Sequence, residues 1–132
     1  MMKVVIIIKP GFLEKTQDVI NSYASIGYNE IQRTQIVLTK EQCETIWGDI
    51  KQKEQEGQLI PGYFDRYCTY IMSGYCNCIY ITKNAISNYQ EVIDMKNALR
   101  KKYNVHGFRD LLHSSDSSEN AEIEFSCIFE QN

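Results

Sequence analysis

Runs of β-branched residues alternate along the chain with apolar residues at helical spacing. Residues 4–8 are all valine or isoleucine, which is typical of a central strand buried on both faces. The run ends at a Lys-Pro-Gly segment, residues 9–11. Apolar residues then recur at helical spacing over residues 13–26, and Gly27 is placed to end the helix that they predict. The N-terminal quarter therefore predicts a buried strand followed by a crossover helix.

The next segment predicts a second strand and a second helix. Residues 28–38 alternate loosely between polar and apolar side chains, which favours a strand. Thr39 follows at an N-cap position with Gln42 three residues later, the pattern of a capping box. We expect the helix that starts there to reach about residue 54. Residues 58–62 have no regular period and predict an irregular connection.

Strands and helices continue to the C-terminus. Residues 76–82 predict a strand, residues 84–103 a helical run in one or two pieces, and residues 124–129 a final strand. Together the elements predict an α+β fold, an α/β sandwich. A ferredoxin-like βαββαβ antiparallel sheet with helices packed on it matches the order best.

Composition limits the classes of protein that remain. A chain of 132 residues, 43% of them hydrophobic, is long enough for one domain with a real core, and we expect a single domain over residues 1–132. The net charge of −3 argues against a protein that coats nucleic acid or an anionic membrane. The longest apolar run, residues 4–8, is far shorter than the roughly 20 residues of a membrane span. We therefore expect no membrane association and a cytoplasmic location.

Two other residue patterns have structural interpretations. The 5 cysteines are odd in number and form no CxxC pair, so reduced structural thiols are favoured over disulfides or a zinc site. The tyrosines of residues 63–80 could stack on nucleic-acid bases, but they are not interleaved with basic residues. Packing in the core or at an interface explains them better, and we expect no nucleic-acid partner.

His113 is the residue with the clearest chemical potential. A histidine can be uncharged and nucleophilic near neutral pH, so it can accept a phosphoryl group directly. This requires a bare ring nitrogen and a partner on the other nitrogen, which Glu124 could provide if the chain folds back. Lys9, Arg100 and Arg109 are candidate partners for phosphate charge, although Arg109 also suits a structural ion pair. From the residues alone, an ordinary loop position remains open for this histidine.

Three separated segments resemble the nucleoside diphosphate kinase family. Residues 109–124 follow the order of its active-site signature, which is an Arg-Asn pair, two apolar residues, the catalytic histidine, a small residue, Ser-Asp and an Ala-Glu-rich helix. The first strand with Lys9, and residues 99–103 before the histidine, are also similar. The resemblance covers essentially the whole chain, is most specific over residues 100–124 and is vague over residues 47–91.

The resemblance implies a function and roles for individual residues. A member of this family transfers the γ-phosphate of a nucleoside triphosphate such as ATP to a nucleoside diphosphate, by a ping-pong mechanism through phospho-His113. Glu124 would hold the other ring nitrogen, and Ser115 would support that pair. Lys9 and Arg100 would contact the phosphates or the sugar hydroxyl.

The resemblance also implies a metal, a base site and an assembly. Asp116 would help to order, through water, the Mg²⁺ that bridges the terminal phosphates, although it could simply cap a helix that opens near Ser117. Leu59 or Tyr63 would cover the base. Trp47 is expected to pack within its helix, although a family tyrosine near this position lies by the histidine. Family members form dimers that assemble further, so we expect a homo-oligomer, at least a dimer, with a hexamer possible by analogy.

Several departures from the family pattern leave alternatives open. Asp110 replaces an asparagine at a sugar-binding position and puts a negative charge near the polyphosphate. Residues 84–99 are too few to supply a further arginine and threonine, and Glu91 lies where that arginine would be; Ser114 replaces a glycine. These changes suggest a catalytically weak or silent nucleotide-binding or interaction module. A more remote alternative is a metabolite-sensing regulatory domain that does not need His113.

Overall fold

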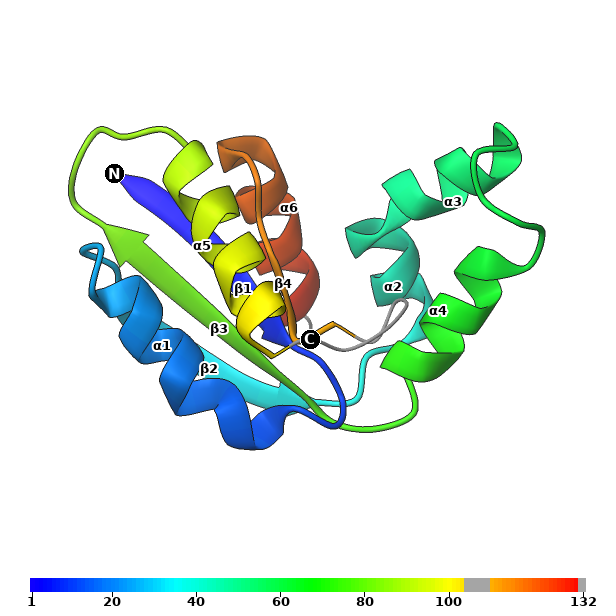
Figure 1. The fold of residues 1–132 in the computed structure, drawn as a ribbon, viewed down its shortest axis with the longest axis horizontal. Helices are drawn as coiled ribbons and strands as arrows, with labels where there is room; N and C mark the ends of the chain where they lie inside the picture. The colour runs from blue at the N-terminus through cyan, green and yellow to red at the C-terminus, as the bar shows by residue number, and fades with distance from the viewer. Residues whose placement is uncertain (104–109, 131–132) are drawn as a thin grey trace.

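A four-stranded antiparallel sheet in the order β2-β3-β1-β4 organises the computed structural model, which describes residues 1–103 and 110–130. The strands of this described part are β1 (Met2–Ile8), β2 (Asn29–Ile36), β3 (Cys76–Lys83) and β4 (Leu112–Ser114). Figure 1 shows helices on the sheet and a separate group of helices beside it.

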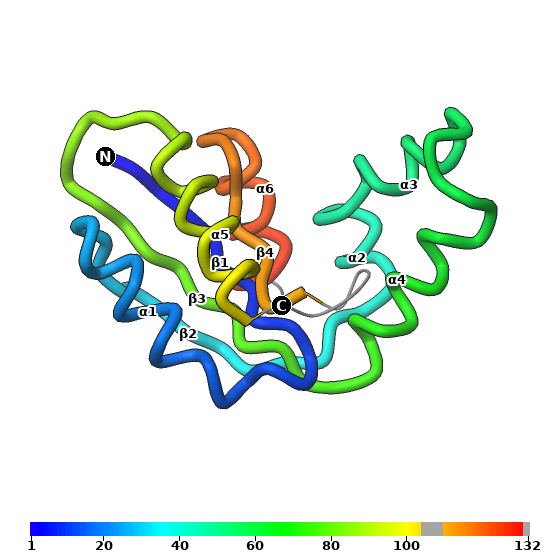
Figure 2. The backbone as a smooth tube through the Cα atoms, in the orientation of Figure 1, coloured from blue at the N-terminus to red at the C-terminus, as the bar shows by residue number. Residues whose placement is uncertain are grey.

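The order of helices and strands confirms the ferredoxin-like prediction. After a short 3₁₀ turn η1, the helices are α1 (Thr16–Ala24), α2 (Lys40–Ile46), α3 (Gly48–Gln55), α4 (Tyr63–Ile71), α5 (Gln90–Lys102) and α6 (Ser118–Phe129). The elements β1, α1, β2, β3, α5 and β4 form the βαββαβ unit. The tube in Figure 2 shows that α2, α3 and α4, which we call the arm, are inserted between β2 and β3. No helix in the described ranges is long and apolar enough to cross a membrane.

β1 is buried on both faces, as its composition predicted. Its alternate residues enter two separate apolar clusters because successive side chains of a strand point to opposite faces. Val4, Ile6 and Ile8 pack in the cluster that includes α1 and α5, whereas Val5 and Ile7 pack in the cluster that includes the arm and α6. Burial of each such side chain contributes about 1.5–3 kcal/mol. Burial on both faces therefore fixes the position of β1 and of the strands paired with it.

The helix predicted over residues 39–54 begins as expected but is interrupted. Thr39 Oγ1 accepts from the Gln42 amide at 3.1 Å and the Gln42 side chain accepts from the Thr39 amide at 2.9 Å, so the capping box is confirmed. At Trp47 the backbone leaves the helical region with φ −115° and ψ 30°, and α3 starts anew at Gly48. Burial of the indole and the low helix propensity of glycine explain a break that the helical pattern did not reveal.

The strand predicted over residues 124–129 is wrong, because these residues belong to α6. Ala121, Glu124 and Ile128 are buried at helical spacing on this helix. Ser117 is its N-cap and accepts from the Asn120 amide at 3.1 Å. A short run of apolar and aromatic residues cannot by itself distinguish a strand from the end of a helix.

The helical run predicted over residues 84–103 begins late, at Gln90. The residues before it connect β3 to α5, and Glu91 in the first turn of α5 forms an ion pair with Lys83 at 2.9 Å. Glu91 is therefore part of the attachment of α5 to the sheet. Residues 84–99 contain no arginine, so this segment supplies no further guanidinium group.

α4 was not predicted, although its sequence carries a helical signal. The buried positions of this helix are Phe64, Tyr67, Cys68 and Ile71. Glu54 of α3 fixes the start of α4, since its carboxylate accepts from the amides of Gly62 at 3.0 Å and Phe64 at 2.7 Å. Gly62 takes a φ of 85°, which favours glycine. These contacts hold α3 and α4 together as one hairpin.

Candidate active site

β4 positions His113 beside the end of β1. In the antiparallel register, His113 is opposite Ile7, and directly opposed residues project from the same face of a sheet. Ile7 belongs to the cluster on the arm side, so the imidazole also lies on that side. The neighbouring residues Leu112 and Ser114 are buried, which anchors the short strand. Sequence periodicity missed β4 because three residues are too few to establish a period.

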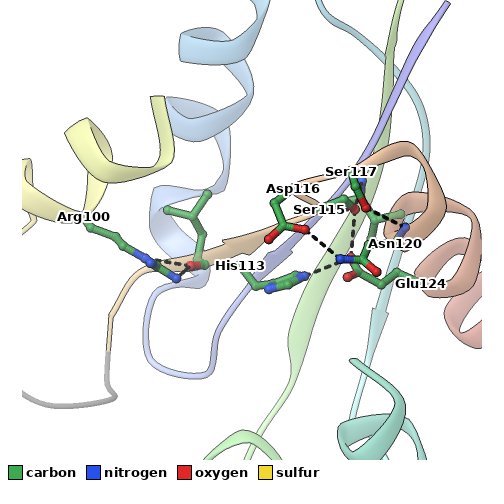
Figure 3. Close-up of polar contacts among 9 residues, drawn as sticks. Arg100, His113, Ser115, Asp116, Ser117, Asn120 and Glu124 are labelled. Carbon is green, nitrogen blue, oxygen red and sulfur yellow. Dashed lines mark hydrogen bonds and ion pairs between the residues drawn. The ribbon is translucent and has the colours of Figure 1, made fainter. Parts of the chain in front are cut away.

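Glu124 holds one nitrogen of the imidazole ring, and Ser115 holds Glu124 (Figure 3). His113 Nε2 lies 2.9 Å from Glu124 Oε1, and the Ser115 hydroxyl donates to the same oxygen at 2.8 Å. The Ser115 oxygen also accepts from the Val5 amide at 3.0 Å, so this hydroxyl has partners in both roles. An ionised carboxylate only accepts hydrogen bonds, which places the ring proton on Nε2 and a lone pair on Nδ1. The expected association of these three side chains is present.

The aromatic residues of the arm fix the plane of the ring. The ring centroids of Trp47 and His113 lie 5.3 Å apart, with an angle of 72° between the ring planes. Tyr67 also packs edge-to-face against Trp47, with a centroid separation of 5.4 Å. Edge-to-face packing of this kind restrains ring rotation. Trp47 is only 4% exposed, so it is a packing residue as expected and also a neighbour of the histidine.

Lys9, Asp110 and Arg100 form an ion-pair network beside the histidine. Lys9 Nζ donates to Asp110 Oδ1, and Arg100 Nε lies 3.3 Å from Asp110 Oδ2. Arg100 also donates to the Leu112 carbonyl through Nε at 3.2 Å and Nη2 at 2.9 Å. Lys9 is 1% exposed, and this burial lowers the pKa of its ammonium group to about 8 even though Asp110 acts to raise it.

These groups open into a pocket of about 380 Å³, which lies within the size range of small-molecule sites. Its lining residues are Lys9, Trp47, Asp49, Ile50, Lys53, Tyr63, Tyr67, Lys96, Arg100, Asp110, His113, Ser114 and Asp116. Ser115 and Glu124 are buried behind the histidine. A larger groove of about 750 Å³ between α2 and α6 includes none of these lining residues, so its size does not make it the chemical site.

Only one of the two residues proposed to cover a base lines the pocket. Tyr63, at the start of α4, is part of the lining together with Ile50 of α3. Leu59 is half-buried in the connection between these helices and lies outside the lining. Arg109, which the sequence offered as a candidate partner for phosphate charge, lies outside the described residues.

The sequence reasoning missed two further cations. Lys96 lies one turn before Arg100 on α5, and both side chains line the pocket. Burial, and next the charge of Arg100, lower the pKa of Lys96. Lys53 of α3 faces the same pocket from the arm. The spacing of Lys96 and Arg100 by four residues on a helix was a signal that could have identified Lys96.

Asp116 lies at the edge of the pocket, where α6 begins. Its Oδ1 accepts from the Asn120 side chain at 2.7 Å, and the carboxylate is exposed. The backbone cap of α6 is provided by Ser117, so the capping role considered for Asp116 belongs to its neighbour. Among residues 1–103 and 110–130, no group of three or more His, Cys, Asp or Glu side chains could hold a metal ion. Any cation here would need most of its oxygen ligands from a bound molecule or from water.

Comparison with known protein families gives a match along almost the entire chain. The model of the family described as nucleoside diphosphate kinase matches residues 3–132. Proteins named nucleoside diphosphate kinase from two strains of Nitratidesulfovibrio vulgaris are 30% identical to the chain over 133 residues. Each alignment covers 93% of this chain and 90% of the relative.

Solved structures are similar in fold. The apo nucleoside diphosphate kinase of Encephalitozoon cuniculi superposes with a TM-score of 0.77 at 20% identity, covering 99% of this chain and 90% of that one. The Aquifex aeolicus nucleoside diphosphate kinase gives a TM-score of 0.71 at 18% identity, covering 96% of this chain and 94% of that one. These likenesses support the same arrangement of sheet and helices.

Proposed function

The chain belongs to the nucleoside diphosphate kinase family, and we propose that it transfers a γ-phosphoryl group from a nucleoside triphosphate to a nucleoside diphosphate through phosphorylated His113. The family is one of phosphotransferases. One observation carries the residue assignment. Glu124 holds Nε2 of His113, and the same histidine lines a pocket that also contains Lys9 and Arg100.

In the first half-reaction, the lone pair of His113 Nδ1 attacks the γ-phosphorus. An N–P bond forms as the bond from phosphorus to the β,γ-bridging oxygen breaks, and the electron pair leaves with the nucleoside diphosphate. The ring becomes positively charged while its proton stays on Nε2. Glu124 is 2.9 Å from that nitrogen and stabilises the charge.

In the second half-reaction, a different nucleoside diphosphate enters the same pocket. A terminal oxygen of its β-phosphate attacks the phosphorus, the N–P bond breaks, and the electron pair returns to Nδ1. The product is a nucleoside triphosphate and the histidine is restored. One site used by two substrates in turn gives ping-pong kinetics.

We assign the cations of the pocket to the phosphates of the nucleotide. Arg100 offers a planar guanidinium group that its bonds to the Leu112 carbonyl keep in position. Lys9 and Lys96 add charge from β1 and α5. Tyr63 and Ile50 provide aromatic and apolar surface on the arm, and we assign the base to that side in preference to Leu59.

The residues also suit Mg²⁺ held mainly by the nucleotide. Mg²⁺ keeps several waters and commonly takes only one or two carboxylates along with substrate phosphates. Asp116 lines the pocket with an exposed carboxylate, of which one oxygen is engaged by Asn120, so it fits a role through water. When bound, Mg²⁺ would withdraw negative charge from the terminal phosphates.

The test is to incubate the native chain with γ-labelled ATP and Mg²⁺ and then add GDP. We expect protein-bound label that is labile in acid, stable in base and lost to GDP as GTP. If ATP binds but no label appears, the protein is instead a silent nucleotide-binding module. The pairing of Asp110 with both Lys9 and Arg100 is the observation that favours this second candidate.

Lys9 predicts how binding depends on pH. Its pKa of about 8 means that the charged form is lost as pH rises through that value, so affinity for ADP should fall between about pH 7.5 and 9.5. Unfolding does not explain such a fall. Between the lowered and the ordinary pKa, Lys9 binds more protons in the unfolded chain than in the folded chain. The contribution of Lys9 to the free energy of unfolding therefore increases with pH over this range. Calorimetric titrations should show the fall for the native chain and a flat profile for Lys9→Arg; identical profiles would contradict the assignment.

We also propose a homo-oligomer, at least a dimer, by analogy with the family. Light scattering at micromolar concentration should give a mass of two or more chains, and a monomer would contradict the proposal. The cytoplasm is the compartment proposed for the protein, since it supplies nucleotides and keeps thiols reduced, and the described cysteines are all free. Fractionation of cells tests this placement.

A further inference from the structure

Asp110 occupies a place between two cations of the pocket. Its Oδ1 accepts from Lys9, which comes from the end of β1, and its Oδ2 lies 3.3 Å from Arg100 Nε, which comes from α5. Both carboxylate oxygens are therefore engaged by cations. A phosphate group bound at this position would present its oxygens to the same two side chains.

The pairing of Lys9 has an electrostatic reason. Its ammonium group is 1% exposed, and a buried charge without a counter-ion is strongly destabilising. The Asp110 carboxylate supplies that counter-ion within the chain. A phosphate that approaches Lys9 and Arg100 must share these cations with the carboxylate or displace it, and it meets the negative charge of Asp110 as it does so.

We propose that Asp110 is a specificity-determining residue that competes with phosphate for Lys9 and Arg100, and so makes the site select metal-complexed nucleotides over metal-free ones. This inference rests on the proposed function and concerns the same pocket. The repulsion from the carboxylate grows with the negative charge of the ligand. A divalent cation cancels part of that charge, so the metal complex is penalised less.

The test compares binding of ATP in excess Mg²⁺ with binding of ATP in excess chelator, by calorimetry at about pH 6. This pH is set well below the native Lys9 pKa of about 8, because Asp110 raises that pKa and its removal lowers it further. Asp110→Asn keeps the shape of the side chain and removes its charge. We expect it to bind metal-free ATP about tenfold more tightly than the native chain, and the Mg²⁺ complex at most about threefold more tightly. Asp110→Ser should change the ratio of the two affinities in the same direction.

Asp94→Asn is the matched control. It removes the same charge from α5, where Asp94 is exposed, accepts from the Gln90 side chain and lies outside the pocket lining. Its affinity ratio should equal that of the native chain. A general structural disturbance by the Asp110 variants would weaken both forms of ATP, whereas loss of a competitor strengthens the metal-free form most.

The outcomes separate this inference from the proposed function. If the native chain binds the Mg²⁺ complex and Asp110→Asn leaves the affinity ratio unchanged, or weakens both forms, the inference is wrong and the proposed function stands. If the native chain and the variants bind no ATP in either form, the proposed function is wrong and the inference falls with it.

Discussion

The His113→Ala variant should bind ATP but transfer its γ-phosphoryl group to GDP at least about 10⁴-fold more slowly than the native chain. No other described side chain of the pocket is placed with a free ring nitrogen and a carboxylate on the opposite side. The reaction without His113 would require direct transfer between two nucleotides in a pocket of about 380 Å³. Steady-state turnover with ATP and GDP measures the loss.

The fold should tolerate this change. The imidazole is 15% exposed, and Glu124 keeps the hydrogen bond from Ser115 when the histidine is absent. ATP affinity by calorimetry should remain within about tenfold of native, because Lys9 and Arg100 are untouched. His113→Gln provides a polar variant of similar length that cannot form the phosphoenzyme. Transfer at a native rate by either variant would show that His113 is not the nucleophile.

The Glu124→Gln variant should lose about 10²- to 10⁴-fold in the rate of transfer while keeping most of its ATP affinity. A glutamine fits the same space, but it carries no charge to stabilise the imidazolium that forms in the first half-reaction. Its amide can also donate to Nε2, which would place the ring proton on Nδ1 and block the nucleophile. Single-turnover formation of the phosphoenzyme measures this step apart from product release.

Glu122→Gln is the control for the loss of an acid on α6. Glu122 is exposed, and it lies outside the lining of the pocket that contains His113. Its phosphoenzyme should form at the native rate. If Glu124→Gln also forms phosphoenzyme at the native rate, the carboxylate only supports the fold and the role assigned to it is wrong.

Local patterns in the sequence were sufficient to predict an element where all the residues that define it lie in one short segment. The β-branched run of β1 and the capping box at Thr39 are complete within a few residues, and both are present as predicted. The end of α6 was mistaken for a strand because six residues of mixed apolar character do not define a period. The break at Trp47 depends on contacts with Tyr67 and His113, which no local pattern contains.

In the candidate site, too, some contacts could be predicted from the sequence, whereas others depend on long-range contacts in the fold. The association of His113, Glu124 and Ser115 followed from the family resemblance, and α6 brings the carboxylate back to the ring. The pairing of Lys9 with Asp110 was not predicted, because the two residues are separated by 101 positions. They meet only when β4 pairs with the end of β1. Contacts that depend on such long-range strand pairing require the fold.

The insertion of the arm between β2 and β3 has an evolutionary consequence. His113, Glu124, Lys9 and Arg100 come from the βαββαβ unit and α6, whereas Ile50, Lys53 and Tyr63 come from the arm. Glu54 joins α3 to α4, so the hairpin keeps its shape through contacts of its own. Under the proposed placement of the base against the arm, substitutions in the arm during evolution should change base preference while leaving His113, Glu124 and Arg100 in place.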